Sequence, residues 1–242
     1  MNLIVDVGNS YVKFAVFQQG KLLHKIATEL IHFNEVFKTI CDDFPNIDKT
    51  IVSSVGKLEP SHIEALKKNG TVLVLNSEVN LPFENLYKTP KTLGVDRIAL
   101  VSASVNQFPD ANVLIIDAGT CITYDFINSK NQYFGGAISP GIRLRYQSLH
   151  NLTANLPLLD TEIPKNIIGS STSEAIHSGV IHGVLKEIEG VIEEYQKKYS
   201  DLTVILTGGD ANFLSNQLKN SIFANSNFLL EGLNFILEFN TE

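Results

Sequence analysis

Two short segments of the chain place an acid after an apolar strand and before a glycine turn. In "LIVDVGNS" Asp6 precedes Gly8, and in "VLIIDAGT" Asp117 precedes Gly119. A glycine two residues past the acid permits a tight turn whose backbone N–H groups can bind a phosphate. A carboxylate repels phosphate unless a cation lies between them, so Asp6 suggests Mg²⁺ held through water. The pair predicts a site for nucleotide phosphates.

Two more features belong to this prediction, and each also has an ordinary structural interpretation. Lys13, on the strand after the first turn, is either a phosphate contact or an edge-strand lysine in water. Thr207-Gly208-Gly209-Asp210 follows a strand and is expected to pack a glycine turn against adenine or ribose, with Asp210 as a helix N-cap. One acid–glycine turn alone indicates a capped hairpin. Two turns whose acids lie 111 residues apart, in matched strand–turn–strand contexts, favour the nucleotide site.

Motifs of several other chemistries are absent from the sequence. There is no P-loop, no G-x-G-x-x-G turn after a strand and no G-x-S-x-G nucleophile motif. The histidines are scattered and do not have zinc-ligand spacing. These absences leave the paired acid–glycine turns as the phosphate-binding feature.

Composition describes a globular chain of 242 residues, 44% of them hydrophobic, with a net charge of −7 and a pI near 5.4. The acidic balance argues against a general nucleic-acid binder. Two cysteines without a CxxC pair indicate no disulfide framework. The N-terminus lacks the basic region of a signal peptide, and no apolar run is long enough to span a bilayer. We therefore expect a soluble, cytoplasmic protein that binds neither nucleic acid nor membrane.

Apolar periodicity predicts alternating strands and helices in both halves of the chain. Capping boxes are expected at Ser61 to Glu64 and at Ser171 to Glu174. The predicted strands are 2–6, 11–18, 21–27, 49–55, 71–76, 113–117, 121–127, 132–138 and one before Thr207. The predicted helices are 33–43, a short one ending near 69, 96–107, 142–152, 171–198, one after Asp210 and 228–239. This pattern predicts two α/β lobes facing across a cleft.

Paired phosphate hairpins with a glycine-rich adenosine turn resemble the acetate and sugar kinase, Hsp70 and actin superfamily. Four further stretches resemble type III pantothenate kinase, namely "GVDR" at 94–97, "GGAISPG" at 135–141, "STSEAIHSG" at 171–179 and "EGL" at 231–233. The resemblance covers essentially the whole chain. It implies two ribonuclease H-like lobes facing across a nucleotide cleft. Residues 1–111 would carry the first phosphate turn and the substrate motif, and residues 112–242 the second turn and the adenosine motif.

The resemblance also implies the reaction, which is ATP-dependent phosphorylation of pantothenate to 4′-phosphopantothenate, the first step of coenzyme A biosynthesis. Asp6 would bind Mg²⁺ through water, and Asp117 would bind a monovalent cation, K⁺ or NH₄⁺. The ATP-binding residues implied by the resemblance are Asp6, Val7, Gly8, Asn9, Ser10, Tyr11, Val12, Lys13 and Thr120.

For the acceptor, the resemblance implies a pantothenate site formed by Tyr87, Gly94, Val95, Asp96, Arg97 and Thr172. Asp96 would be the general base for the substrate hydroxyl, and Arg97 would anchor the polar end of the substrate. Thr172 would reach the substrate from the neighbouring subunit of a homodimer, so the site would lie at the dimer interface.

Several alternatives stay open at this point. The chain could be a kinase for another small alcohol, an actin- or Hsp70-like ATPase switch, or an accessory factor in transcription. One of Arg143 and Arg145, which follow Pro140-Gly141, is expected to face a cleft or a dimer partner, and the other to be solvated. The sequence does not distinguish them.

Overall fold

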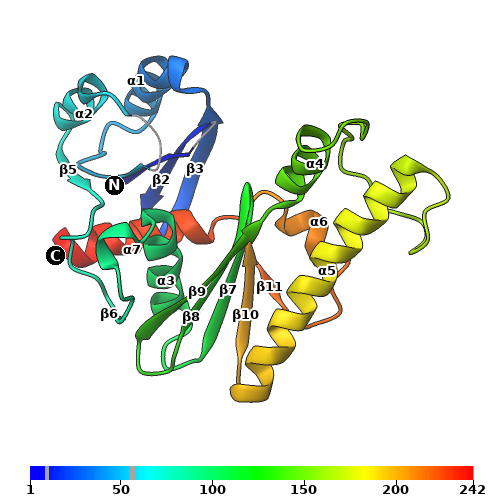
Figure 1. The fold of residues 1–242 in the computed structure, drawn as a ribbon. Coiled ribbons are helices and arrows are strands. Elements are labelled where there is room, and N and C mark those ends of the chain that lie inside the picture. Colours follow the sequence, from blue (N-terminus) through cyan, green and yellow to red (C-terminus); the bar gives the residue numbers. More distant parts are fainter. Residues whose placement is uncertain (9–10, 55–57, 242) are drawn as a thin grey trace. The chain divides into compact units, whose positions relative to one another are not determined.

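The computed structural model describes residues 1–8, 11–54 and 58–241, and the chain divides into two compact units (Figure 1). Unit 1 comprises Met1–Pro109, Asn131–Tyr133 and Asn227–Glu242, and unit 2 comprises Asp110–Lys130 and Phe134–Ser226. The two units therefore do not coincide with the two halves of the sequence. The C-terminal segment from Asn227 belongs to unit 1, with the N-terminal half.

Unit 1 contains a five-stranded sheet in the order β3-β2-β1-β4-β5. The hairpin strands β1, β2 and β3 are antiparallel, whereas β4 pairs with β1 and β5 with β4 in parallel. The strand bounds are β1 Asn2–Val7, β2 Val12–Gln18, β3 Lys21–Thr28, β4 Lys49–Ser54 and β5 Thr71–Val74. The first three confirm the strands predicted from the apolar runs.

Helices cover both faces of this sheet (Figure 1). On one face α1 and α2 pack on alternate residues of β1, including Leu3 and Val5. Successive strand residues point to opposite faces, so Ile4 and Asp6 point to the other face, which α3 and α7 cover. The helices are α1 Phe33–Asp43, α2 Pro60–Lys67, α3 Val95–Gln107 and α7 Phe228–Thr241, with short 3₁₀ turns at Leu30–His32 and Pro90–Thr92.

Unit 2 repeats this sheet with its own strands, in the order β11-β10-β7-β8-β9. The hairpin partner β8 is antiparallel to β7, while β10 pairs with β7 and β11 with β10 in parallel. The bounds are β7 Val113–Ala118, β8 Cys121–Ile127, β9 Gln132–Pro140, β10 Thr203–Thr207 and β11 Phe223–Ala224. The first two residues of β9 belong to unit 1, where they pair with β6, Glu84–Asn85.

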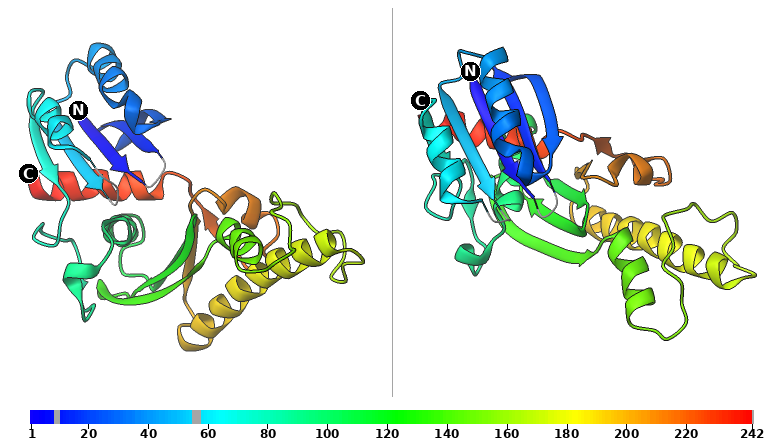
Figure 2. Two further views of the ribbon diagram at one scale, coloured as in Figure 1. Left: turned by 45° about the horizontal axis from the view of Figure 1, so that its top comes forward. Right: turned by 90° about the horizontal axis from the view of Figure 1, so that it is seen from above.

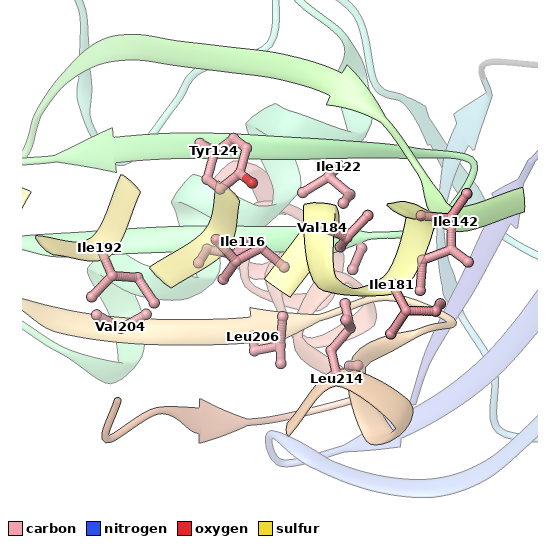
Figure 3. Close-up of a cluster of buried hydrophobic side chains, with 14 of the residues drawn as sticks. Ile116, Ile122, Tyr124, Ile142, Ile181, Val184, Ile192, Val204, Leu206 and Leu214 are labelled. Atoms are coloured by element: carbon pink, nitrogen blue, oxygen red, sulfur yellow. The ribbon is translucent and has the colours of Figure 1, made fainter. Parts of the chain in front are cut away.

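The long helix α5, Thr172–Lys198, runs along one face of the unit 2 sheet (Figure 2). Its apolar side chains, such as Ile181 and Val184, face Ile116 of β7 and Leu206 of β10 in the core (Figure 3). The shorter helices α4, Ile142–Asn151, and α6, Ala211–Ser215, complete the same core. Successive residues of a strand point to opposite faces of the sheet. Asp117, which follows Ile116, therefore lies on the face of β7 opposite to this core.

The structure departs from the sequence predictions mainly at short elements. The capping box expected at Ser61 is wrong, because α2 begins at Pro60 and Ser61 Oγ donates to Glu59 instead. The second capping box is confirmed by the Glu174 N–H, which donates to Ser171 Oγ at 3.3 Å. Two-residue strands such as β6 and β11 carry no periodicity and escaped prediction.

A close backbone approach joins α3 to α7 within unit 1. A Cβ placed on Gly232 would lie 1.9 Å from the carbonyl oxygen of Ala99. We expect Gly232→Ala to force the helices apart and to lower the free energy of unfolding by about 1–3 kcal/mol. In a chain of this length each 1 kcal/mol lowers Tm by roughly 2–4 °C.

A helical glycine in unit 2 provides the matched control. Gly183 is exposed within α5, and a Cβ there would meet nothing within 4 Å. Gly183→Ala should raise stability by roughly 0.5–1 kcal/mol, because alanine loses less backbone entropy in a helix. Thermal unfolding followed by circular dichroism measures both changes. A Gly232→Ala variant as stable as the natural chain would contradict the packing argument.

Candidate functional site

The turn between β1 and β2 carries the first acid. Asp6 is the last residue but one of β1, and Lys13 lies directly opposite on β2. The N–H of Gly8 donates to the carbonyl of Tyr11 at 3.0 Å and closes the turn. The sequence left open that Lys13 is an edge-strand lysine in water. That alternative is wrong, because β2 lies between β1 and β3 and is not an edge strand.

Other expected ATP contacts lie around the same turn. Val7 and Val12 are buried and paired across the strands, so their side chains support the turn and only their backbone can meet a ligand. Tyr11 is 55% exposed. Asn9 and Ser10 lie outside the described residues.

The Asp6 side chain is almost entirely removed from water, at 10% exposure. Burial raises its pKa, Lys13 Nζ at 3.6 Å from Oδ2 lowers it, and the negative charge of Asp96 raises it again. The nearby Ser53 hydroxyl on β4 also lowers this pKa. Among the described residues, however, no partner of Ser53 Oγ meets the distance and angle of a hydrogen bond. The end of β1 therefore gathers two acids, one cation and a hydroxyl with capacity for a further partner.

Asp96 reaches this region from the first turn of α3. Its Oδ1 accepts a hydrogen bond from the Arg97 N–H at 2.9 Å. Gly94 is the N-cap residue, and a Cβ there would lie 2.3 Å from Asp96 Oδ1. The glycine thus leaves room for the carboxylate to fold back over the helix start, and Val95 begins the helix.

Arg97 is buried, at 5% exposure, and its guanidinium lies 5.5 Å from the ring centroid of Tyr87. The Tyr87 ring stacks on Tyr133, with centroids 6.2 Å apart, and Phe83 meets Tyr133 edge-on at 5.8 Å. Such cation–π and aromatic contacts hold a planar cation in one orientation. Tyr87 and Arg97 were expected from the sequence, whereas Tyr133 was not, because its link to Tyr87 depends on the two-residue strand β6.

The second acid lies on an equivalent turn in unit 2. Asp117 is the last residue but one of β7, and the N–H of Gly119 donates to the Cys121 carbonyl at 2.9 Å. Thr120 is exposed at the turn, so its hydroxyl and N–H can meet a ligand. Opposite Asp117 on β8 is Thr123, where Asp6 has a lysine.

Two glycine motifs far apart in the sequence pack against this turn. A Cβ on Gly141, in "GGAISPG", would lie 2.1 Å from the Gly119 carbonyl oxygen, and the Gly141 N–H donates to the Thr120 carbonyl at 3.0 Å. Gly208 has a φ of +96°, and a Cβ there would lie 2.4 Å from Asp117 Oδ1. The turns "IDAGT", "SPG" and "TGGD" therefore form one backbone-lined site in unit 2.

Asp210 follows Gly208 and Gly209 and occupies the N-cap position of α6. Its side chain makes no capping hydrogen bond there, contrary to the expected role, and its N–H donates instead to the Ala118 carbonyl at 2.9 Å. Burial raises the pKa of this carboxyl.

Thr172 is the first residue of α5 and lies at a different place in unit 2. It lines an apolar groove of about 590 Å³ between α4 and α5, together with Leu149, Leu156, Ile176 and Val180. The structure thus groups the expected residues into three sets. Unit 1 holds the Asp6 and Asp96 set, and unit 2 holds the turn around Thr120 and the groove at Thr172.

Within the described residues, no group of three or more His, Cys, Asp or Glu side chains is arranged to hold a metal ion. Among the helices described, none is long and apolar enough to cross a membrane.

Comparisons with known proteins agree with the resemblance. A family model described as type III pantothenate kinase matches residues 2–194. A type III pantothenate kinase from Christiangramia forsetii is 55% identical over 240 residues, which cover 99% of each sequence.

Two solved structures show the fold. A protein from Campylobacter jejuni, named as a Baf family transcriptional activator, aligns with a TM-score of 0.65 at 24% identity over 98% of both chains. A ROK family glucokinase from Streptomyces griseus aligns with a TM-score of 0.54 at 10% identity, over 99% of this chain and 98% of that one. The expected sugar-kinase type of α/β fold is confirmed, and the match over residues 2–194 together with the 55% identity to a relative shows that the chain belongs to the type III pantothenate kinase family.

Proposed function

We propose that the chain performs the reaction of its family, ATP-dependent phosphorylation of pantothenate to 4′-phosphopantothenate at the start of coenzyme A biosynthesis, with Asp96 as the general base. The observation that carries this proposal is the family match along residues 2–194, with 55% identity to a relative over nearly the whole chain. The charge of Asp96, which raises the pKa of Asp6 within unit 1, supports the assignment of both carboxylates to one site.

On the nucleotide side, the β1–β2 turn contributes Asp6 and Lys13, and the β7–β8 turn contributes the hydroxyl and N–H of Thr120. Mg²⁺ prefers carboxylate oxygens and keeps several waters, which fits one buried carboxylate beside the Ser53 hydroxyl better than a cage of protein ligands. Asp6 would hold this ion, which when bound neutralises phosphate charge. Lys13 balances the charge of Asp6 and lies at the turn for a phosphate oxygen.

On the acceptor side, Asp96 takes the proton of the substrate hydroxyl as that oxygen bonds to the γ-phosphorus and the bond to ADP breaks. In a loose transition state the proton leaves late, so an ordinary carboxylate is a competent base. Arg97, held over Tyr87, offers a fixed fork of N–H donors to the polar end of pantothenate. Gly94 and Val95 line the same helix start.

We further propose that Asp117 binds K⁺ or NH₄⁺ and that the protein is a homodimer in which Thr172 reaches the partner's substrate. Exposed apolar side chains between α4 and α5 support a dimer contact there, and they are Leu152, Leu158, Ile163, Ile167 and Ile168. Both cysteines, Cys41 and Cys121, are free thiols, which supports a cytoplasmic enzyme.

The first prediction about these site residues concerns Asp96. Asp96→Asn should lower kcat for pantothenate by about 10²-fold or more, because the amide cannot accept the proton. ADP release in a coupled assay, with mass detection of 4′-phosphopantothenate, measures it. Asp43→Asn, at an exposed acid of the same unit, is the control and should keep wild-type activity. Turnover by Asp96→Asn at the wild-type rate would refute the base assignment, and hydrolysis of ATP at the same rate without acceptor would favour a nucleotide switch.

The second prediction concerns the stability cost of Asp6. Burial raises the pKa of Asp6 above its unfolded value, so the neutral form suits the fold and stability is lost as the pH rises through the folded pKa. As the pH rises above the unfolded pKa, Asp6 therefore lowers the stability of unit 1, and Asp6→Asn should raise Tm at pH 7 while lowering kinase activity. The gain in Tm should vanish at acidic pH, below the unfolded pKa of about 3.9, where both side chains are neutral. Thermal scans at pH 7 and pH 3.5 test this, and a lower Tm for the variant at pH 7 would contradict it.

The third prediction concerns the monovalent cation. Replacing K⁺ by Na⁺ should reduce turnover by about tenfold or more, which corresponds to ~1.4 kcal/mol of transition-state stabilisation. NH₄⁺ should restore the rate, and Asp117→Asn should make the enzyme indifferent to the choice of cation. Full activity in buffer with Na⁺ as the sole monovalent cation would overturn this role of Asp117.

A further inference from the structure

The backbone before α4 supports the turn that carries Thr120. The Gly141 N–H bonds the Thr120 carbonyl, and the backbones approach so closely that no side chain fits at residue 141. A displacement of Gly141 must therefore displace the β7–β8 turn. The question is which group fixes Gly141 in place.

Arg145, one turn into α4, holds the two residues that precede Gly141. Its Nε donates to the Pro140 carbonyl at 2.9 Å, and its Nη2 donates to Ser139 Oγ at 2.9 Å. Its own backbone N–H donates to the Gly141 carbonyl at 3.1 Å. One side chain thus ties the end of β9 to the first turn of α4, on both sides of Gly141.

The guanidinium is itself fixed from the opposite side by α5. Arg145 Nη2 lies 2.5 Å from Glu187 Oε2, and Tyr124 on β8 donates its hydroxyl to Glu187 Oε1 at 2.9 Å. Burial would raise the pKa of Glu187, but its hydrogen bonds from the guanidinium and two hydroxyls outweigh burial and lower it. Burial and the neighbouring carboxylate raise the pKa of Tyr124. At neutral pH Glu187 is therefore an ionised acceptor and Tyr124 a protonated donor. Both Tyr124 and Arg145 then donate hydrogen bonds to Glu187.

Arg143 lies two residues away in the same helix and has none of these contacts. Its side chain is 46% exposed and meets the Leu159 carbonyl at 2.9 Å and the fully exposed Asp160 at 3.4 Å. An exposed pair of this kind contributes little to stability. Of the two arginines that the sequence could not distinguish, Arg145 is thus the one built into the frame of the site.

We propose that Arg145 is a positioning residue for ATP, which acts through Ser139, Pro140 and Gly141 to fix the β7–β8 turn. This inference rests on the proposed function of that turn as a phosphate contact. The planar fork is essential to it, because one guanidinium engages Pro140, Ser139 and Glu187 in three directions at once. A lysine ammonium keeps the charge but lacks this fixed geometry.

The test measures binding of ATP and of pantothenate separately, by calorimetry, in the full-length protein. Arg145→Lys should raise the Kd and KM for Mg-ATP by about tenfold, or ~1.4 kcal/mol, with the Kd for pantothenate within about twofold of wild type. Arg143→Lys is the matched control and should leave both values unchanged. An unchanged Kd for ATP in Arg145→Lys would overturn the proposal. So would a selective loss of pantothenate binding, because Arg145 also lines the groove at Thr172.

Ser139→Ala provides a second variant in case Arg145→Lys folds poorly. It removes the hydrogen bond from Arg145 to Ser139 Oγ and the contact of that hydroxyl with Glu187, and it leaves the ion pair between Arg145 and Glu187 in place. We expect a rise of about two- to fivefold in the KM for ATP, equivalent to ~0.4–1 kcal/mol, with kcat and Tm unchanged. A fall in Tm with no change in KM for ATP would mark the network as structural only and would overturn the proposal.

The two levels of inference fail in different ways. If the natural chain binds ATP but does not phosphorylate pantothenate, the proposed function fails, whereas calorimetric ATP binding still tests Arg145. If the natural chain phosphorylates pantothenate and Arg145→Lys binds ATP normally, the positioning role alone is refuted.

Discussion

An acidic side chain held almost out of water at the end of β1 is the constraint on which unit 1 depends. Burial disfavours the ionised form of Asp6, so the group needs Lys13 on the next strand. The β1–β2 register provides that partner and directs Asp6 to the face covered by α3, where Asp96 begins the helix. A slip of one residue would turn Asp6 into the apolar core and would separate all three groups.

The two units share one strand pattern, but they surround their acids with different groups. In each, an acid near the end of the first strand has a hydroxyl residue beside it on the parallel strand, Ser53 in unit 1 and Thr207 in unit 2. They differ across the hairpin, where Lys13 faces Asp6 but Thr123 faces Asp117. The β7–β8 turn is also one residue shorter, as the registers of the two hairpins show. Unit 1 thus brings a fixed cation to its acid, whereas unit 2 surrounds its acid with close-packed backbone.

Most of the fold could be predicted because its elements carry strong local signals. The amphipathic helix 33–43 and the strands around both acids were found within one or two residues. The two candidate phosphate turns were predicted from glycine that follows an acid at fixed spacing. The Tyr133 stack and the Arg145 network escaped, because each depends on contacts between distant segments, β6 with β9 and α4 with α5. Such pairings leave no periodicity in any single stretch of sequence.

The return of α7 to unit 1 has a consequence for the order of biosynthesis. The strands of unit 1 are made before unit 2, yet α7, which covers one face of their sheet together with α3, emerges after all of unit 2. On the ribosome, β1 residues on that side, such as Ile4, must therefore wait for the cover of α7 while residues 110–226 are synthesised and begin to fold. The unit 1 strands are thus translated before unit 2 but completed after it, and during that interval they expose apolar surface that can aggregate.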